Sequence, residues 1–236
     1  MSTFQFKHFS VSQNNATMKV GTDAMLLGSL VEAENPSSIL DIGTGTGVIA
    51  LMLAQRFENT NVSGLEIDEE ASQEAKQNFE QSTWKDRLEA IHGDVLKIEF
   101  EARFELVVSN PPYYENSLIS ENERTSRAKH AEFLPIDQLL RKVASILTEN
   151  GSFWVIVPSE NAQTWMNEAE QNQLSLHTSI AIIGKEGQSE KRRIMAFSKE
   201  EKPFKSASLT IRNIDGNYTP EYIELTKEFH DRDLSK

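Results

Sequence analysis

The sequence of 236 residues fits one sizeable α/β domain. Its 38% hydrophobic and 25% charged residues indicate a globular protein with a core and exclude a disordered chain. It contains no cysteine, which excludes a disulfide framework and a thiolate metal site. The net charge of −12 argues mildly against nucleic-acid binding, although a local basic patch is compatible with it. The sequence shows no signal-peptide pattern and no apolar run of membrane-spanning length, so we expect a cytoplasmic protein without a membrane partner.

The first predicted elements are an N-terminal arm and a helix, residues 1–35. Apolar and polar residues mostly alternate over residues 4–11, which predicts a hairpin or an extended arm. A turn-rich stretch follows, and Thr22 with Asp23 is expected to cap a helix that includes Met25 and continues to Leu30. The resemblance described below implies that this arm and helix close over a cofactor site.

Strands and helices alternate through the rest of the chain. Strands are predicted at 39–42, 61–67, 88–92, 104–109, 152–157, 174–183 and 194–198, and helices after 48 and at 69–81, 135–150, 160–170 and 219–229. Only seven residues, 184–190, separate the last two strands, which requires an antiparallel hairpin. We therefore expect an α/β fold: a seven-stranded, mostly parallel sheet with an antiparallel final hairpin and helices on both faces. The whole chain, 1–236, is one domain with residues 203–236 as a C-terminal extension, where 209–211 is a candidate further strand.

A glycine-rich turn joins the first core strand to its helix. Gly43, Gly45 and Gly47 follow Asp41 in the run Asp41–Gly47, which predicts a tight turn that lets a ligand approach backbone N–H groups at a helix N-terminus. By itself such a turn could serve a dinucleotide, a phosphate or simply close helix–strand packing. The spacing is G-x-G-x-G, not the dinucleotide G-x-G-x-x-G, and no Gly-Lys-Ser/Thr follows to grip a phosphate.

Three acidic residues end three successive predicted strands. Asp41 would repel a pyrophosphate but suits an ammonium or sulfonium group, Glu66 can accept hydrogen bonds from ribose hydroxyls, and Asp94 can accept from the adenine amine. Ligands of such sheets bind at the carboxyl ends of the strands. S-adenosylmethionine, a cationic nucleoside without phosphates, fits the set, and helix caps or solvated charges are the alternative reading.

The fourth strand ends at Asn110-Pro111-Pro112-Tyr113. Two prolines stiffen this loop and prevent a helix. The side-chain oxygen of Asn110 and the carbonyl of Pro111 can accept both hydrogens of a planar amine, and Tyr113 can stack on the ring that carries it. These residues predict an amine acceptor held for methyl transfer by positioning rather than by a strong base.

Together, Asp41–Gly47 and Asn110–Tyr113 resemble the amino-methyltransferase group of class I, Rossmann-like, S-adenosylmethionine enzymes. More narrowly, the sequence is similar to the bacterial tRNA(Val) adenine-N6 methyltransferase family. The segments that carry this similarity are Phe6–Phe9, Met18–Asp23, Leu26–Gly28 and Tyr218–Tyr222. The resemblance implies methyl transfer from S-adenosylmethionine to N6 of adenine 37, beside the anticodon of valine tRNA, with S-adenosylhomocysteine as product. It also implies that the segment before Gly21 lies near cofactor and substrate.

Two basic groups are candidates for tRNA contact. Arg124 and Arg127, with Lys129 and His130, lie in a long polar loop, and Lys191, Arg192 and Arg193, with Lys185, lie around the final hairpin. If the sixth strand is parallel to the core, both groups border the mouth of the site. Interleaved glutamates leave ordinary solvated charge as the alternative.

Two other functions share parts of this pattern. A protein glutamine-amide methyltransferase uses the same Asn-Pro-Pro-Tyr motif, but it usually has a separate helical N-terminal domain. A non-catalytic cofactor- or RNA-binding module would not need the amine cradle. The five histidines lack metal-ligand spacing, so we expect no metal, and no obligate protein partner is evident.

Overall fold

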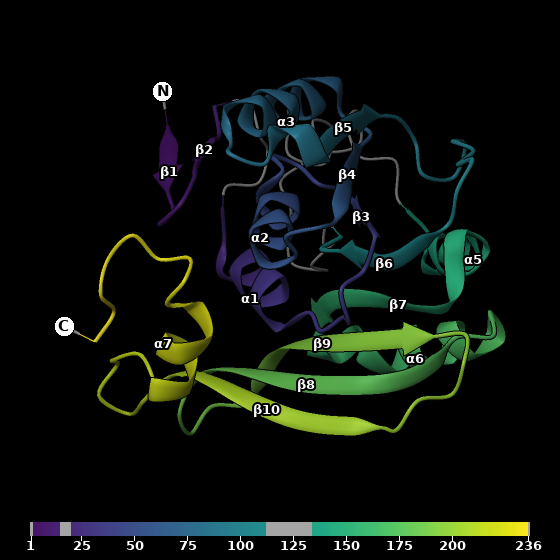
Figure 1. Cartoon of the computed structure of the whole chain (residues 1–236). Coiled ribbons are helices and arrows are strands. Elements are labelled where there is room, and N and C mark those ends of the chain that lie inside the picture. Colours follow the sequence, from purple (N-terminus) through teal and green to yellow (C-terminus); the bar gives the residue numbers. More distant parts are fainter. Residues whose placement is uncertain (1, 15–19, 112–133, 236) are drawn as a thin grey trace, which may run out of the picture.

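The computed structural model describes residues 2–14, 20–111 and 134–235, which form an α/β fold around one large sheet (Figure 1). The strands are β1 (Thr3–Gln5), β2 (Ser10–Ser12), β3 (Ser38–Ile42), β4 (Asn61–Glu66), β5 (Leu88–His92), β6 (Phe104–Ser109), β7 (Leu147–Pro158), β8 (Ser175–Lys185), β9 (Glu190–Ser198) and β10 (Lys205–Arg212). The helices are α1 (Thr22–Leu30), α2 (Val48–Arg56), α3 (Glu69–Gln81), α5 (Ile136–Ile146), α6 (Ala162–Gln171) and α7 (Pro220–Thr226), with 3-10 turns at Lys85–Arg87 and Ser159–Asn161.

The main sheet runs in the order β10-β8-β9-β7-β6-β3-β4-β5, and β9 is the one antiparallel strand among these eight. The mostly parallel sheet and the antiparallel final hairpin are therefore confirmed, as is the parallel direction of the sixth predicted strand, β8. The predicted count of seven is short by one. β10 pairs in parallel with β8 at the sheet edge, and its first residues, 205–208, are exposed and mostly polar, so they show no strand pattern.

A second difference lies at the end of α5. The sequence predicted that this helix ends at Asn150-Gly151, but it ends at Ile146. Leu147 already begins β7, where it pairs with Phe104 of β6 beyond a register shift. Leu147 continues the apolar helical pattern, yet its side chain is fully buried as part of the strand, so periodicity alone misplaced the boundary.

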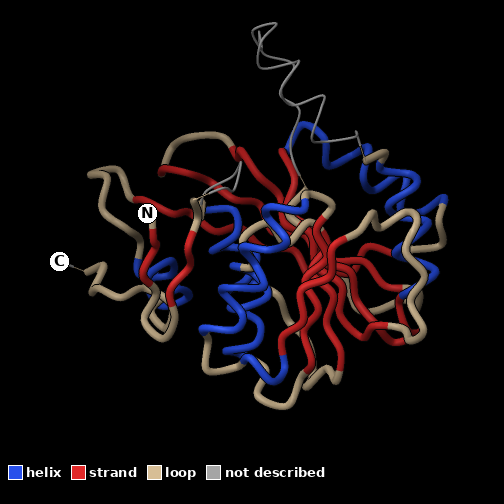
Figure 2. The backbone as a smooth tube through the Cα atoms, turned by 90° about the horizontal axis from the view of Figure 1, so that it is seen from above, coloured by secondary structure: helices blue, strands red, loops and turns tan. Residues whose placement is uncertain are grey.

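Helices cover both faces of the sheet, as Figure 2 shows. Successive residues of the central strands alternate between two cores: Leu106 and Val108 of β6 face one side, and Val107 faces the other. The first core takes side chains from α1, α2, α3 and α7, and the second takes them from α5 and α6. Both faces of these strands are buried, which explains their continuous apolar runs.

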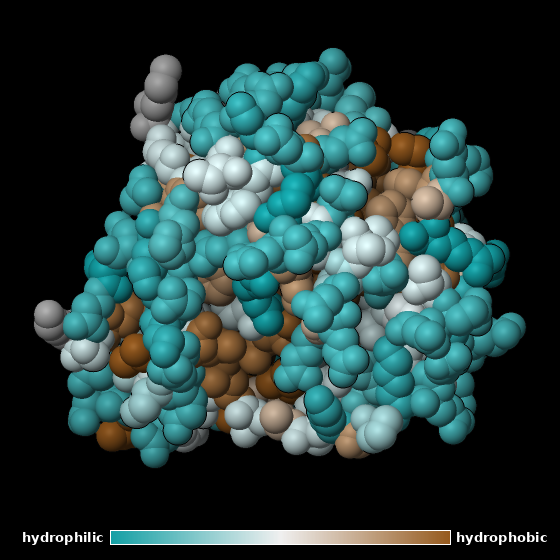
Figure 3. Space-filling view, viewed as in Figure 1, coloured by the Kyte–Doolittle hydropathy of each residue, from teal (hydrophilic) through white to brown (hydrophobic). Residues whose placement is uncertain are grey.

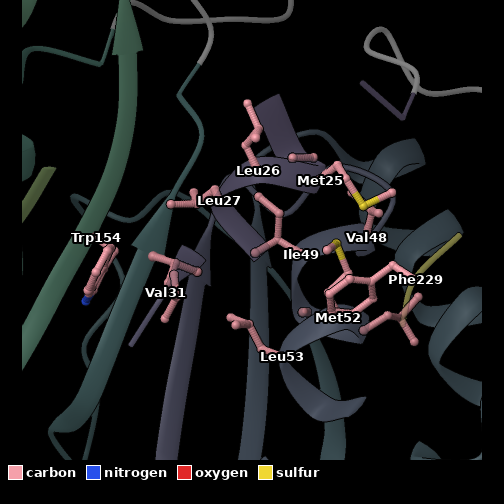
Figure 4. Close-up of a cluster of buried hydrophobic side chains, with 14 of the residues drawn as sticks. Met25, Leu26, Leu27, Val31, Val48, Ile49, Met52, Leu53, Trp154 and Phe229 are labelled. Carbon is pink, nitrogen blue, oxygen red and sulfur yellow. The ribbon is translucent and has the colours of Figure 1, made fainter. Parts of the chain in front are cut away.

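The first core is centred on the contact between α1 and α2 (Figure 4). Gly28 lies where a Cβ atom would stand 2.7 Å from the sulfur of Met52, so a larger residue at this position would displace the buried Met52 side chain. Leu26, Leu27 and Leu53 are fully buried beside this contact. This packing fixes α1 above the sheet, next to the helix that follows the glycine turn.

The N-terminal hairpin, β1 and β2, lies beside α3 and contacts the C-terminal tail (Figure 1). The backbone N–H of Lys7 donates to Phe229, Phe6 pairs with His230, and Lys7 forms an ion pair with Glu228 at 3.0 Å. The predicted hairpin is confirmed. Most of the face shown in Figure 3 is hydrophilic, with an apolar area in the region of α1 and α7. Among the helices of the described ranges, none is long and apolar enough to cross a membrane.

Candidate functional site

The glycine turn connects β3 to α2 at the carboxyl edge of the sheet. Gly43, Gly45 and Gly47 all have positive φ angles of 71°, 55° and 84°, a region that favours glycine. A Cβ at Gly43 or Gly45 would meet no atom within 4 Å, whereas one at Gly47 would stand 2.3 Å from Phe79. Gly47 therefore serves packing against α3, and the first two glycines leave open space above the turn.

Asp41 lies below this turn and is fully buried. Its Oδ2 accepts a hydrogen bond from the Thr44 hydroxyl at 2.6 Å, while its Oδ1 has no hydrogen-bond partner in the described part of the chain. Burial raises the pKa of Asp41 to about 7; the nearby negative charge of Glu66 adds to this, and hydrogen bonds from Thr44 and the Ala50 backbone oppose it. A buried carboxylate with a free oxygen favours a cationic or hydrogen-bond-donating ligand.

Glu66 ends β4, next to the turn. Its two oxygens accept hydrogen bonds from the backbone N–H groups of Gly45 at 2.9 Å and Asp68 at 3.0 Å. Each carboxylate oxygen keeps a lone pair for a further donor. Sequence reasoning missed its neighbour Ile67, whose side chain is 43% exposed although it is large and apolar. The sequence pattern that could have pointed to it is an apolar residue between two acidic residues, Glu66 and Asp68, at the end of a strand.

Asp94 follows β5, the strand paired with β4. It caps a turn, because Oδ1 accepts from the Leu96 N–H at 2.9 Å and Oδ2 pairs with Lys97 at 2.9 Å. Partial burial acts to raise the pKa of Asp94, but the hydrogen bonds from Lys97 and Leu96 hold it below the usual value. The carboxylate is thus ionised and positioned, while its contact with adenine stays a prediction.

Asn110 and Pro111 follow β6 on the other side of the turn, and both are half-buried. Ser109 pairs with Ile42 in register, and its hydroxyl donates to the Ile42 carbonyl at 2.9 Å. Asn110 therefore emerges beside Gly43. The sequence placed Asn110, the glycine turn, Glu66 and Asp94 at the carboxyl ends of strands, and the structure shows that these ends lie side by side in the order β6, β3, β4, β5.

The basic group of the final hairpin reaches the same edge, because Arg192 pairs with Pro158 at the carboxyl end of β7. Arg192 Nε donates to Asp23 of α1 at 2.9 Å, and Arg193 pairs with Glu190 at 2.7 Å. Within the described ranges, Lys185 and Lys191 form no ion pair. The two lysines thus offer charge that is not already neutralised by a carboxylate.

Several predicted site residues lie outside the described residues, namely Tyr113, Arg124, Arg127, Lys129 and His130. No group of three or more histidine, aspartate or glutamate side chains that could hold a metal ion occurs in the parts of the chain that the structure describes.

Two solved structures that share this fold are methyltransferases. A predicted O-methyltransferase from Agrobacterium tumefaciens is 19% identical and aligns with a TM-score of 0.69 over 88% of this chain and 96% of that chain. A geranyl diphosphate C-methyltransferase from Streptomyces coelicolor, in complex with S-adenosyl-L-homocysteine, is 14% identical, with a TM-score of 0.54 over 75% of this chain and 76% of that chain. The chain therefore has the fold of the class I S-adenosylmethionine-dependent methyltransferases.

Sequence comparison narrows the class. Residues 14–174 match the methyltransferase small domain family. A tRNA1(Val) (adenine(37)-N6)-methyltransferase of Flavobacterium johnsoniae is 41% identical, covering 96% of this chain and 98% of the relative, and one of Bacteroides thetaiotaomicron is 38% identical, covering 96% of each. The chain belongs to the tRNA1(Val) (adenine(37)-N6)-methyltransferase family.

Proposed function

We propose that the protein transfers a methyl group from S-adenosylmethionine to N6 of adenine 37 in valine tRNA, in the cytoplasm. The observation that carries this proposal is the position of Asn110 beside the open glycine turn at one sheet edge, in a chain of this family. S-adenosylmethionine supplies an electrophilic methyl group when bound, and S-adenosylhomocysteine remains after transfer.

The residues present fit this methyl donor. The open space above Gly43 and Gly45 admits a ligand close to the backbone, and the unpartnered Oδ1 of Asp41 suits the donor's ammonium group. Glu66 would accept from ribose hydroxyls and Asp94 from the adenine amine. Ile67 adds an exposed apolar surface beside Glu66, against which a nucleoside base can pack. None of these contacts needs a phosphate or a metal ion.

The acceptor amine would be held by Asn110 and Pro111. A side-chain carbonyl and a backbone carbonyl would accept its two hydrogens and keep the ring in one orientation, and Tyr113 would stack on the base. Fixed orientation and exclusion of water would supply most of the rate. No strong general base is required, because an amine nitrogen becomes acidic only as it gains the methyl group.

The surface that would receive tRNA lies along the same edge. We assign Lys191, Arg192 and Arg193 of β9 to it, together with Arg124 and Arg127 of the long loop. Phosphate contacts of lysine and arginine position an RNA without reading its sequence. The N-terminal arm and α1, residues 1–35, would close over the donor site from the side of α3, and residues 203–236 form an extension of the single domain.

Methyl transfer with purified substrates tests the proposal. We expect radiolabelled methyl groups to enter valine tRNA but not a translation release factor, and Asn110→Ala to abolish the transfer while the protein stays folded. Labelling of release factor alone would favour a glutamine-amide methyltransferase. Full biological activity of Asn110→Ala would favour a non-catalytic binding module.

A further inference from the structure

Asn78 of α3 joins the N-terminal hairpin to the glycine turn through one buried amide. The side chain is 1% exposed. Its Nδ2 donates to the Thr46 carbonyl at 2.9 Å and to the Ser12 carbonyl at 3.0 Å, and its Oδ1 accepts from the Ser12 N–H at 2.9 Å. Ser12 and Thr46 thus meet at one residue that lies 66 and 32 positions away from them, respectively.

The contact with Ser12 has the form of strand pairing. Backbone hydrogen bonds of the hairpin join Phe6 to Phe9 and Gln13 to Ser2. Hydrogen-bonded and non-hydrogen-bonded pairs alternate along an antiparallel ladder, so Ser10 and Ser12 occupy non-hydrogen-bonded pairs and their N–H groups point away from β1. Asn78 donates to the carbonyl and accepts from the N–H of Ser12, as a neighbouring strand would. The amide therefore has one orientation in which all its bonds are satisfied.

This orientation matters at the turn. Thr46 lies between Gly45 and Gly47, two glycines that have no Cβ atom and therefore restrict the φ and ψ angles of the turn little by themselves. The amide of Asn78 holds the Thr46 carbonyl from below, on the side where Phe79 packs against Gly47. The backbone of Ser12 fixes the orientation of the Asn78 amide through its own two hydrogen bonds. A displaced hairpin would leave Asn78 free to rotate and the turn without this restraint.

We propose that Asn78 is a positioning residue that couples the seating of the N-terminal hairpin to binding of the methyl donor. The inference rests on the proposed function, because it assigns the donor to the glycine turn. Coupling of this kind is reciprocal: a seated hairpin strengthens donor binding, and a bound donor protects the hairpin. Asn78 acts through the Thr46 carbonyl and is not itself a catalytic residue.

Calorimetric titration of the full chain with S-adenosylhomocysteine tests the coupling. We expect Asn78→Ala to weaken binding about tenfold, the scale of one lost buried hydrogen bond. Ser12→Pro removes the N–H that faces Asn78 and, at an outward edge position, leaves the hairpin ladder intact. It should weaken binding about threefold. Ser10→Pro, the same change at an edge residue that is not among the hydrogen-bond partners of Asn78, should leave the affinity unchanged.

The double variant decides between coupling and a merely structural role. If Ser12 acts through Asn78, Asn78→Ala with Ser12→Pro binds no more weakly than Asn78→Ala alone. Hydrogen exchange gives a second readout: S-adenosylhomocysteine should slow exchange over residues 10–13 in the wild type but not in Asn78→Ala.

Additive losses would overturn the inference, as would an unchanged affinity in folded Asn78→Ala. If that variant fails to fold, an unchanged affinity in Ser12→Pro overturns it instead. Absence of binding to the wild type would overturn the proposed donor site and, with it, this inference. Binding to the wild type combined with additive losses would overturn this inference alone.

Discussion

Arg192 of β9 and Asp23 of α1 form an ion pair in which Nε lies 2.9 Å from Oδ2, with 29% and 27% of the two side chains exposed. The pair connects the first turn of α1 to the carboxyl edge of the sheet, across 169 residues of sequence. Arg192 thus has a structural partner in addition to its proposed role toward tRNA.

Exchanging the two charges separates these roles. We expect Arg192→Asp to lower stability by about 1 kcal/mol, because a partly buried carboxylate then faces Asp23. Adding Asp23→Arg should restore the unfolding midpoint but not the tRNA affinity, because the positive charge has moved to α1. Thermal unfolding and filter binding measure the two effects. Full recovery of tRNA affinity in the exchanged protein would show that Arg192 contributes through α1 alone.

Lys185 and Lys191 provide a cleaner test of the RNA surface, because neither is ion-paired within the described ranges. Lys185→Glu with Lys191→Glu should weaken tRNA binding and lower the slope of log affinity against log salt by about two. Lys76→Glu with Lys85→Glu is the charge-matched control, since both lysines are exposed, Lys76 on α3 and Lys85 at the amino edge of the sheet. Equal losses in both proteins would indicate an effect of net charge and would contradict a local surface.

Gly45 in the glycine turn and Gly216 outside it should respond to alanine with the same loss of stability but with different effects on ligand binding. Gly45 and Gly216 have φ angles of 55° and 88°, and a Cβ at either meets nothing within 4 Å. Alanine at either position should cost about 1–2 kcal/mol of stability from backbone strain. Only Gly45→Ala should also weaken S-adenosylhomocysteine binding, because its methyl group occupies the open space above the turn. Calorimetry on both variants measures this, and equal affinities would remove Gly45 from the site.

Asp41 should make stability and donor binding respond to pH in opposite directions. Its pKa is about 7 when folded and 3.8 in the reference state, so the folded protein binds an extra proton between these values. Stability from this group therefore falls as pH rises from about 4 to 7 and is constant above. Asp41→Asn removes this pH dependence. At pH 8 the variant should be more stable than the wild type, by at most about 4 kcal/mol in the free energy of unfolding.

Donor affinity should show the reverse trend in the wild type. A cationic donor favours ionised Asp41, so binding of S-adenosylmethionine should strengthen as pH rises toward 7 and then level off. Asp41→Asn should bind the donor weakly at every pH. Unfolding and titration at pH 5, 6, 7 and 8 measure both trends. A wild-type affinity that does not change with pH would contradict a direct contact between Asp41 and the cation.

The sequence predicted which residues gather at the carboxyl ends of the parallel strands, because the patterns that mark these strands are local. Buried runs such as Leu106–Ser109 mark parallel strands, and parallel strands bring their carboxyl ends together, so Asp41, Glu66 and Asn110 could be assigned to one edge. Only the second half of β10 was a candidate strand, at 209–211, because the exposed first half carries polar residues. Its pairing with β8, and not a local pattern, determines its conformation.

Contacts between distant polar residues could not be predicted in the same way. Nothing around Asn78 distinguishes it from the other polar residues of α3 until Ser12 and Thr46 are found against it. The ion pairs of Arg192 and Arg193 likewise emerged only with the structure. They show that these two arginines of the proposed RNA surface are already paired with carboxylates. The proposed roles of Tyr113, Arg124 and Arg127 stay predictions, since these residues lie outside the described ranges.

The proposed reaction is methylation of one adenine in one tRNA. Nucleoside mass spectrometry of purified valine tRNA measures it most directly, in cells with the wild-type gene, without the gene, and with Asn110→Ala. We predict N6-methyladenosine at position 37 only with the wild-type gene. The same level of N6-methyladenosine in all three samples would contradict the account.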